Sequence, residues 1–315
     1  MPKVYIVILN YKRWQDVQDC LLSVFKSNYK RFTIIVIDND SQNNSLQIIM
    51  KWLDDLSSVK KEEKEVYSYK YCYEKGIGVE TDFDTFPLYF VQNNSNKGFA
   101  AGNNIVIQAL LKYEAHLWLL NPDIIVKENT LHELIAFAAK CPSKSIIGNT
   151  VKSYSNKETV LLLGGARINY NSATISLIKN ENKIDKVDFI YGGSLFTHTS
   201  HFREIGLLPE EYFLFWEEAD WCYQARSKGY KMLFCNSAIC YDKGSTTIGK
   251  GFLANYYYTL NGFRFLSKYK RDKIAMAMVF GILRGGWRII SGKWARALGV
   301  FKGMIDFLER KNVNK

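Results

Sequence analysis

The stretch VYIVILNYKRWQDVQDCLLSVFKSNYKRFTIIVIDNDS, residues 4–41, contains the unit from which the rest of the chain can be interpreted. An apolar run at Val4–Leu9 is followed by apolar residues at helical spacing over Trp14–Phe25, and a second apolar run occupies Thr33–Ile37. Continuous apolar runs of this length are typical of strands that are buried on both faces of a sheet. The stretch therefore predicts a strand, a helix and a second strand.

The same alternation continues for another 80 residues. The spacing predicts two further helices and two further strands, at Ser45–Leu56, Leu88–Val91, Ala100–Lys112 and Leu117–Leu120. Alternating strands and helices indicate an α/β fold with a mostly parallel central sheet flanked by helices. Residues 57–86 interrupt the pattern, because they are polar, charged and rich in Tyr. They are expected to form an insertion or a long surface connection, with a short hairpin as one option.

Polar clusters follow the predicted strands at the point where each strand ends. They are Asn10-Tyr11, Asp38–Ser41, Asn93–Asn96 and Asn121–Asp123. Ligands of open α/β sheets bind at the carboxyl ends of the strands. The clusters therefore predict a ligand site at that edge of the sheet.

The net charge of +11 is confined to the end of the chain. Residues 1–249 hold 28 basic and 28 acidic side chains, whereas residues 250–315 hold 14 basic and 3 acidic ones. The second segment is also aromatic, and one apolar stripe of helical spacing runs along it: Trp294, Leu298, Phe301, Ile305 and Leu308. A basic amphipathic segment favours contact with an anionic membrane surface. Packing on the preceding domain and a homodimer contact are the alternatives.

The cysteines and the ends of the chain bear on its location. None of the six cysteines forms a C-x-x-C pair, so reduced, buried thiols in a cytoplasmic protein are expected. The start leads directly into the first strand without a signal-peptide pattern. The apolar run Ile274–Leu283 is too short to cross a bilayer, which takes about 20 residues.

Several short strings carry candidate chemistry. Asn121-Pro122-Asp123 ends a strand, where a carboxylate suits a hard divalent cation held against a diphosphate, although such a string also forms plain turns. Asp38 ends another strand and suits the imide N–H of a pyrimidine base, with helix capping nearby as the alternative. The Gly-rich segment Asn96–Asn104 opens a helix whose free N–H groups suit anions. Gly192-Gly193 is expected to form a backbone-lined shelf for a sugar.

The string WEEADW, residues 216–221, places three carboxylates among large apolar rings. Partial desolvation raises a carboxyl pKa toward the range in which the group exchanges protons. Acidic residues are also common in the first turn of a helix, where the helix dipole favours them. Both interpretations apply here, since residues 219–228 have a helical pattern.

Taken in chain order, six strings resemble the inverting family-2 glycosyltransferases with a GT-A fold, especially the bacterial rhamnosyltransferase-like group. The strings are VILNY (7–11), VIDNDS (36–41), residues 96–104, LNPD (120–123), Gly192-Gly193 and residues 213–222. The resemblance extends over most of residues 3–265. It implies a Rossmann-like GT-A domain at 1–249, with a donor half to about 125 and an acceptor half to 249, and a helical extension at 250–315.

The resemblance also implies a role for each matching residue. Asp38 corresponds to the base-binding carboxylate, and the other donor-binding positions are Asn10, Tyr11, Asn39, Asn96, Gly98, Asn103 and Asn121. Gly192, Gly193 and Trp216 correspond to the acceptor side. Glu218 corresponds to the catalytic base, with Glu217 as second choice and Asp220 as a supporting residue. Asp123 corresponds to the retained acid of the D-x-D motif that holds Mg²⁺ or Mn²⁺.

Three departures from the family pattern concern the same site. Asn121 replaces the first acid of D-x-D, and Leu260 stands where an Arg is usual. Asp242 occupies a position that is often His, and an aspartate there can ligate a hard ion. The metal ligands implied are therefore Asp123 and Asp242.

The resulting expectation is an inverting transferase that moves a sugar from a nucleotide diphospho-sugar to a hydroxyl of a glycan or lipid-linked glycan in bacterial surface polysaccharide synthesis. The group resemblance favours dTDP-L-rhamnose, with a UDP-hexose or UDP-galactofuranose as alternatives. A peripheral position on the inner face of the cell membrane follows from the basic tail. A basic nucleic-acid-binding protein is the alternative of another class, but its charge would not be confined to the tail.

Overall fold

A computed structural model describes residues 1–59, 68–73, 81–180, 182, 187–244, 249 and 251–313. The strands in these ranges are β1 (Val4–Asn10), β2 (Phe32–Asp38), β3 (Tyr69–Tyr73), β4 (Leu88–Gln92), β5 (His116–Leu120), β6 (Ile124–Val126), β7 (Ser145–Ser153), β8 (Val160–Leu163), β9 (Gly165–Asn169), β10 (Thr174–Leu177), β11 (Phe189–Ile190), β12 (Ser194–His198) and β13 (Lys231–Asp242). The helices are α1 (Trp14–Phe25), α2 (Ser45–Val59), α3 (Phe99–Leu110), α4 (Thr130–Ala138), α5 (Thr199–Ile205), α6 (Glu217–Ser227), α7 (Phe252–Tyr269), α8 (Ile274–Ile290) and α9 (Trp294–Val313).

The predicted α/β architecture is confirmed. One sheet has the strand order β3-β4-β2-β1-β5-β12-β7-β13-β6, with β8 paired to β7. Strands β3, β4, β2, β1 and β5 run parallel, as the alternating pattern predicted. Of the predicted insertion, residues 57–59 belong to the end of α2, and residues 69–73 form β3, which pairs parallel to β4 at the sheet edge rather than in a hairpin. The rest of that prediction, at 60–67 and 74–80, lies outside the described residues.

Strand β12 changes the direction of the sheet beside the first strands. It pairs antiparallel to both β5 and β7, and its Ser194 lies opposite Leu120 at the end of β5. The Gly192-Gly193 turn that precedes β12 is therefore brought next to Asn121-Pro122-Asp123. The last long strand, β13, ends at Asp242, which lies opposite Ile124 of β6.

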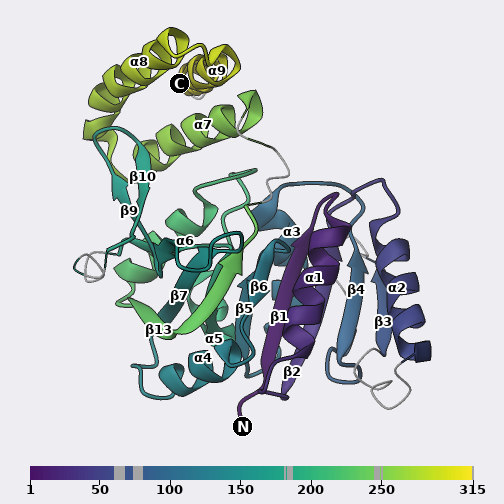
Figure 1. The fold of residues 1–315 in the computed structure, drawn as a ribbon. Helices are drawn as coiled ribbons and strands as arrows, with labels where there is room; N and C mark the ends of the chain where they lie inside the picture. Colours follow the sequence, from purple (N-terminus) through teal and green to yellow (C-terminus); the bar gives the residue numbers. More distant parts are fainter. Residues whose placement is uncertain are drawn as a thin grey trace.

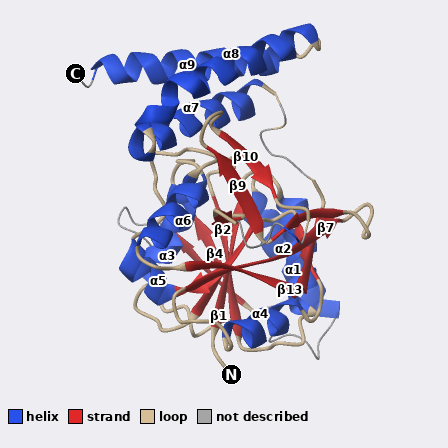
Figure 2. Ribbon diagram, turned by 90° about the vertical axis from the view of Figure 1, so that its left-hand side faces the viewer, coloured by secondary structure: helices blue, strands red, loops and turns tan. Residues whose placement is uncertain are grey.

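Helices cover both faces of the sheet, with α3, α5 and α6 on one side and α1, α2 and α4 on the other (Figures 1 and 2). Residues of β1 alternate between the two layers because successive side chains of a strand point to opposite faces. Tyr5 and Val7 belong to the core under α3, α5 and α6, whereas Val4, Ile6 and Ile8 belong to the core under α1, α2 and α4. All five are fully buried, which explains why the run is uniformly apolar.

The C-terminal helices α7, α8 and α9 form a lobe above the sheet (Figure 1). Helix α7 joins the lobe to the domain, because Phe263, Phe265 and Leu266 belong to the same core as Trp221 of α6. The β9–β10 hairpin reaches the lobe, where the N–H of Ile175 donates to the hydroxyl oxygen of Tyr258 over 2.6 Å. We call α7–α9 the helical lobe.

No described helix is long and apolar enough to cross a membrane, as the run at Ile274–Leu283 indicated. All six cysteines are free. Cys20, Cys222, Cys235 and Cys240 are buried, as expected, whereas Cys72 and Cys141 are only half-buried.

Candidate active site

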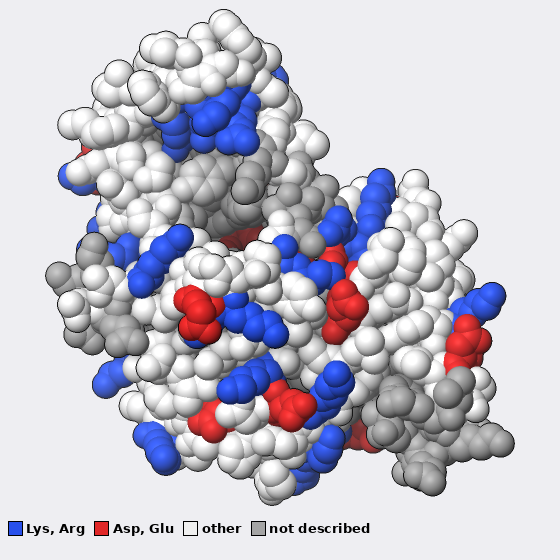
Figure 3. Space-filling model, in the orientation of Figure 1, with Lys and Arg blue, Asp and Glu red and all other residues white. Residues whose placement is uncertain are grey.

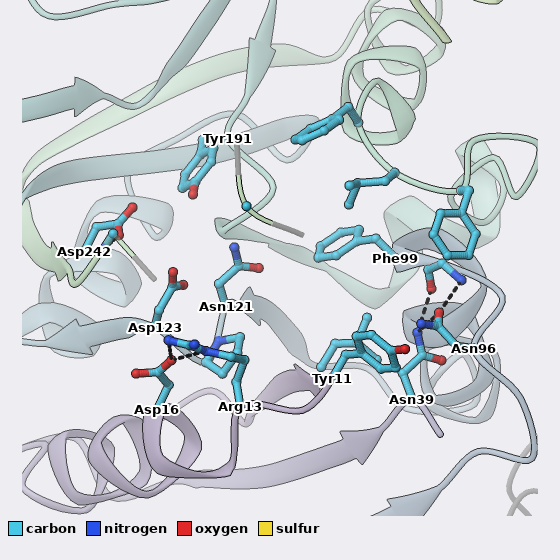
Figure 4. Close-up of a pocket in the computed structure, with 18 residues that line it drawn as sticks. Tyr11, Arg13, Asp16, Asn39, Asn96, Phe99, Asn121, Asp123, Tyr191 and Asp242 are labelled. Atoms are coloured by element: carbon cyan, nitrogen blue, oxygen red, sulfur yellow. Dashed lines mark hydrogen bonds and ion pairs between the residues drawn. The ribbon is translucent and has the colours of Figure 1, made fainter. Parts of the chain in front are cut away.

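A pocket of about 320 Å³ opens at the carboxyl ends of β1, β2 and β5, where the sequence predicted a ligand site (Figure 4). We call it the strand-end pocket. Seven of the predicted site residues line it: Tyr11, Asn39, Asn96, Gly98, Asn121, Asp123 and Asp242. The other lining residues are Leu9, Arg13, Asp16, Phe99, Pro122, Tyr191, Phe213, Leu214, Phe215, Gly244 and Gly249.

Two carboxylates lie side by side at one end of the pocket (Figure 4). Asp123 follows β5 and Asp242 ends β13, and the N–H of Lys243 donates to the carbonyl oxygen of Asp123 over 3.0 Å. Burial and the charge of Asp242 raise the pKa of Asp123 to about 7. Burial also raises the pKa of Asp242. A cation placed between or beside the two carboxylates would therefore stabilise their ionised forms.

A third carboxylate near this end is already paired. Asp16 of α1 accepts from Nε of Arg13 over 2.7 Å and from Nζ of Lys243 over 2.6 Å. Lys243 also pairs with Asp19 at 2.7 Å. The resulting network ties the start of α1 to the end of β13. Arg13 and Asp16 were not predicted as site residues, because only the fold brings residues 13–19 next to residue 243.

The oxygen atoms of Asp123 and Asp242 fit a hard divalent cation such as Mg²⁺ or Mn²⁺, which binds carboxylates together with phosphate oxygens and water. Among the residues that the structure describes, no group of three His, Cys, Asp or Glu side chains is arranged to hold a metal. Two carboxylates alone are a typical protein contribution when the phosphates of a bound nucleotide supply further ligands. The side-chain amide of Asn121 adds no charge at this end of the pocket and acts to lower the pKa of the nearby Tyr191 hydroxyl group.

The opposite end of the pocket is lined by amides and rings (Figure 4). The amide of Asn39 donates to Oδ1 of Asn96 over 2.9 Å and to the carbonyl oxygen of Gly98 over 3.1 Å. Gly98 has a φ of 94°, and a Cβ there would lie 2.1 Å from the carbonyl oxygen of Phe213. Only glycine therefore allows the entrance of α3 to lie against the segment that leads to α6.

Three predicted donor-binding residues lie behind this wall. Asp38 is 3% exposed, and its carboxylate accepts from the amide of Asn10 at 2.6 Å, from Gln92 and from both the N–H and the hydroxyl of Ser41. These four donors use the whole acceptor capacity of a carboxylate. The amide of Asn103 donates to the carbonyl oxygen of Phe99 within α3. In this conformation Asp38, Asn10 and Asn103 hold the pocket wall in place and do not line it.

The acidic pair begins helix α6, two residues earlier than the pattern predicted. Oε2 of Glu217 and Oε2 of Glu218 are both buried without a hydrogen-bond partner among the described residues. Burial raises the pKa of Glu218 to about 7, although the backbone N–H groups of Glu218, Gly192 and Ala219 act in the opposite direction. Burial and the neighbouring Glu218 raise the pKa of Glu217 as well. An orphaned carboxylate oxygen on a group with a pKa near neutrality, as in Glu218, suits proton transfer.

Glu218 adjoins the strand-end pocket through Tyr191 and Gly192. A Cβ at Gly192 would lie 3.4 Å from Cδ of Glu218. Tyr191 lines the pocket together with Asp123 and Asp242, and the charges of Asp242, Asp123 and Glu218 all raise the pKa of its hydroxyl group. The N–H of Asn121 donates to the carbonyl oxygen of Gly193 over 2.9 Å. The two glycines thus connect the acidic pair to the Asp123 end, and these backbone groups bind protein partners.

Two predicted site residues serve the scaffold. Trp216 is fully buried, and its indole N–H donates to the carbonyl oxygen of Tyr258 over 3.0 Å, so its predicted contact with an acceptor is not supported by its position. Asp220 is also fully buried and accepts from Tyr212, Gln224, Lys268 and Tyr269. Because Lys268 and Tyr269 belong to α7, Asp220 anchors α6 to the helical lobe.

The sequence models of two related families match most of the chain. The family described as "Glycosyl transferase family 2" matches residues 5–68, and the one described as "Glycosyltransferase like family 2" matches residues 78–253, which is more than half of the chain. A curated relative, the low-salt glycan biosynthesis hexosyltransferase Agl10 of Haloferax volcanii, is 24% identical over 155 residues. The match covers 47% of this chain and 49% of the relative, so the chain spans about half the length of that protein.

Solved structures with the same fold include two proteins with bound nucleotide sugars. The mannosyltransferase PcManGT from Pyrobaculum calidifontis, in complex with GDP-Man and Mn²⁺, has a TM-score of 0.59 and 11% identity over 98% of this chain and 87% of its own. Residues 1–349 of TarS from S. aureus, in complex with UDP-GlcNAc, have a TM-score of 0.53 and 14% identity over 95% and 80% of the two chains. At these identities the likeness shows the fold, which is GT-A.

Proposed function

The chain belongs to glycosyltransferase-like family 2, and on this basis we propose that it transfers a sugar from a nucleotide diphospho-sugar to an acceptor hydroxyl group, with inversion at the anomeric carbon. The observation that carries the proposal is the strand-end pocket itself. It joins a cation-compatible pair, Asp123 and Asp242, to an amide- and ring-lined end, and a proton-accepting group adjoins it at Glu218.

The donor is proposed to lie along the pocket with its base at the Asn39 end and its diphosphate at the Asp123 end. Tyr11, Phe99 and Asn96 line the base end, where a ring and amides suit a planar heterocycle. Asp38 and Asn10 fix Ser41 and the end of β2 beneath that end. A cation held by Asp123 and Asp242 would neutralise charge on the departing diphosphate.

Glu218 is proposed as the general base. Its raised pKa makes it a better base than an exposed carboxylate, and its orphaned Oε2 has no competing donor among the described residues. It would take the proton of the acceptor hydroxyl as that oxygen attacks the anomeric carbon and the sugar–phosphate bond breaks. Glu217 is the second choice, because the residue as a whole is buried, whereas Glu218 is half-buried.

The sugar and the acceptor are proposed more coarsely. The resemblance to the rhamnosyltransferase-like group favours dTDP-L-rhamnose, and a UDP-hexose or UDP-galactofuranose are alternatives. The neighbours named above are solved with GDP-Man and UDP-GlcNAc, which leaves the choice of donor to experiment. The acceptor is proposed to be a hydroxyl of a glycan or lipid-linked glycan in surface polysaccharide synthesis, at the inner face of the membrane.

A panel of nucleotide sugars tests the proposal. The protein is incubated with Mn²⁺ and each of dTDP-L-rhamnose, UDP-galactofuranose, UDP-GlcNAc, UDP-glucose and GDP-mannose, and released nucleoside diphosphate is measured. Release from one donor, abolished by chelation of the metal, is the expected result. Binding of an oligonucleotide in place of every nucleotide sugar would favour the nucleic-acid alternative.

A further inference from the structure

Three arginines of the helical lobe come together where α8 meets α9. Arg284 lies over the ring of Tyr258, 5.8 Å from its centroid, and its guanidinium donates to Oγ1 of Thr259 over 3.1 Å. Its Nε is buried and has no hydrogen-bond partner among the described residues. Arg288, one turn further along α8, donates to the carbonyl oxygen of Arg296 of α9 over 3.5 Å. We call these three residues the arginine cluster.

The arginine cluster lacks an acidic partner within the described chain. Among the described residues, the ion pairs of the helical lobe are made elsewhere: Lys302 pairs with Asp306, Lys273 with Asp272, and Lys268 with Glu211 and Asp220 of the catalytic domain. Burial lowers the pKa of Arg288, and the charges of Arg284 and Arg296 lower it further. Partly buried like charges are costly unless an anion offsets them. The cluster is therefore a site for an anion that the described chain itself does not supply.

The arginine cluster lies one aromatic ring away from the strand-end pocket. Phe215 lines that pocket, its ring meets the ring of Tyr258 edge-on at 6.0 Å, and Arg284 lies over Tyr258. Figure 3 shows Lys and Arg side chains gathered on the lobe above a hollow in which acidic side chains are visible. An anion bound by the cluster would thus lie beside the mouth of the proposed active site.

The surface around the arginine cluster is apolar and exposed. Trp287 is 68% exposed, Ile290 is 80% exposed and Trp294 is 62% exposed, and all three lie within a few residues of Arg288 and Arg296. Large apolar side chains at such exposure mark a contact surface. A ligand that satisfies both features carries an anionic group and a hydrocarbon chain.

We propose that the arginine cluster binds the phosphate or diphosphate group of a lipid-linked acceptor, whose hydrocarbon chain lies against Trp287, Ile290 and Trp294. Arginine is suited to this role because its planar guanidinium matches phosphate oxygens bidentately. The proposal rests on the proposed transferase function, since it assigns the acceptor of that same site. The proposed ligand is the acceptor and not a bilayer headgroup, because Arg284 contacts the pocket wall through Tyr258.

Calorimetric titration of the full chain with farnesyl diphosphate, in buffer without divalent metal, tests the proposal. The variants are Arg288→Gln, Arg296→Gln and their combination, and Lys302→Gln on α9 is the matched control for loss of one charge. Each arginine substitution is expected to weaken binding about tenfold, as for loss of a charge-assisted hydrogen bond, and the control is expected to leave it unchanged. Inorganic diphosphate should bind more weakly than farnesyl diphosphate.

Further arms separate the possible outcomes. Binding that is unaffected by the double variant, or abolished by Asp123→Asn, would overturn the proposal, because the ligand would then occupy another site. The proposal would also be overturned if the arginine variants lose only their binding to phosphatidylglycerol vesicles in a sedimentation assay. The cluster would then bind the bilayer. Binding of a nucleoside diphosphate with Mn²⁺, measured on the same variants, should be unchanged. If the native protein binds farnesyl diphosphate but does not bind a nucleoside diphosphate with Mn²⁺, the transferase proposal fails, while the lipid phosphate site is retained.

Discussion

Asp123 and Asp242 place two like charges side by side at a buried edge of the sheet. Asp123 comes from a turn after a parallel strand and Asp242 from the end of an antiparallel partner, so only the complete sheet brings them together. The cost of this arrangement appears as the raised pKa of both carboxyl groups. A divalent cation would convert the repulsion into coordination.

The Asp123→Asn variant is expected to stabilise the metal-free protein above pH 7. The folded group has a pKa of about 7 and its ordinary value is 3.8, so the unfolded chain releases this proton first as the pH rises. Ionisation therefore favours unfolding between about pH 4 and pH 7. The melting temperature of the variant should exceed that of the native protein by a margin that widens over this window and then levels off. A margin that is the same at pH 4, 6 and 8 would contradict the raised pKa.

The Glu218→Gln variant is expected to lower kcat by a factor of about 10² to 10⁴, the usual contribution of a general base. Donor affinity should be unchanged, because Gln keeps the shape of the side chain. In the native enzyme the rate should fall as the pH drops below about 7, since the protonated carboxyl cannot accept a proton. Steady-state rates from pH 5.5 to 9 measure both effects.

Glu217→Gln is the matched control for that experiment. It changes the adjacent carboxylate of the same helix, and a smaller loss of kcat is expected. If Glu217→Gln is the slower variant and Glu218→Gln retains native turnover, the assignment of the base within the pair must be reversed.

The strands of the central sheet show which features of a fold a sequence pattern predicts and which it does not. The parallel half of the sheet was predicted because β1, β2, β4 and β5 are buried on both faces and therefore uniformly apolar. The pairing of β12 between β5 and β7 was not predicted, since a five-residue strand carries no signal of its partner or direction. That pairing is what brings the acidic pair, through Gly192, to Asp123.

The start of α6 shows a second limit of sequence patterns. Phe215 and Trp216 have φ values of 65° and 79°, a left-handed conformation that costs bulky residues on the order of 1–3 kcal/mol each. Burial of the Trp216 ring and its bond to Tyr258 help to offset this cost. The Trp residues were predicted to flank the acids, but only the backbone shows that Trp216 turns inward to the core.

Close helix contacts in the helical lobe depend on glycines of α9. A Cβ at Gly299 would lie 2.4 Å from the carbonyl oxygen of Phe252 in α7, whereas a Cβ at Gly286 of α8 would meet open space. Gly299→Ala is therefore expected to destabilise the protein by about 1–3 kcal/mol. Gly286→Ala should be neutral or stabilising by up to about 1 kcal/mol. Urea unfolding of both variants measures this, and equal midpoints would contradict the packing described for α7 and α9.

Across the whole molecule, the net positive charge and the exposed large apolar side chains are concentrated in the helical lobe. The stripe predicted along the tail is one helical face, and four of its five members (Trp294, Leu298, Ile305 and Leu308) are exposed. The inner face of α9 packs through Val300, Met304 and Phe307 instead. A hydrophobic pattern does not distinguish which of two neighbouring stripes of a helix faces the protein when both stripes are apolar.

Replacing Trp287, Ile290 and Trp294 together by Gln is expected to reduce binding to phosphatidylglycerol vesicles at least tenfold, since each exposed side chain would insert its apolar surface at the interface. Co-sedimentation of the full-length variant with vesicles measures this. Tyr154→Gln, an exposed aromatic of the catalytic domain, is the control and should bind as the native protein does. Equal binding by all three proteins would show that the lobe does not contact lipid.

The central claim is that the strand-end pocket holds a nucleoside diphosphate together with a divalent cation at Asp123 and Asp242. Calorimetric titration of dTDP and UDP, with Mn²⁺ and with chelator, tests it on the native protein and on the Asp123→Asn, Asp242→Asn double variant. The account predicts binding of at least one nucleotide that weakens about 100-fold or more without Mn²⁺ and equally in the double variant, as expected when hard-ion coordination is lost. Binding of the same strength under all of these conditions would contradict it.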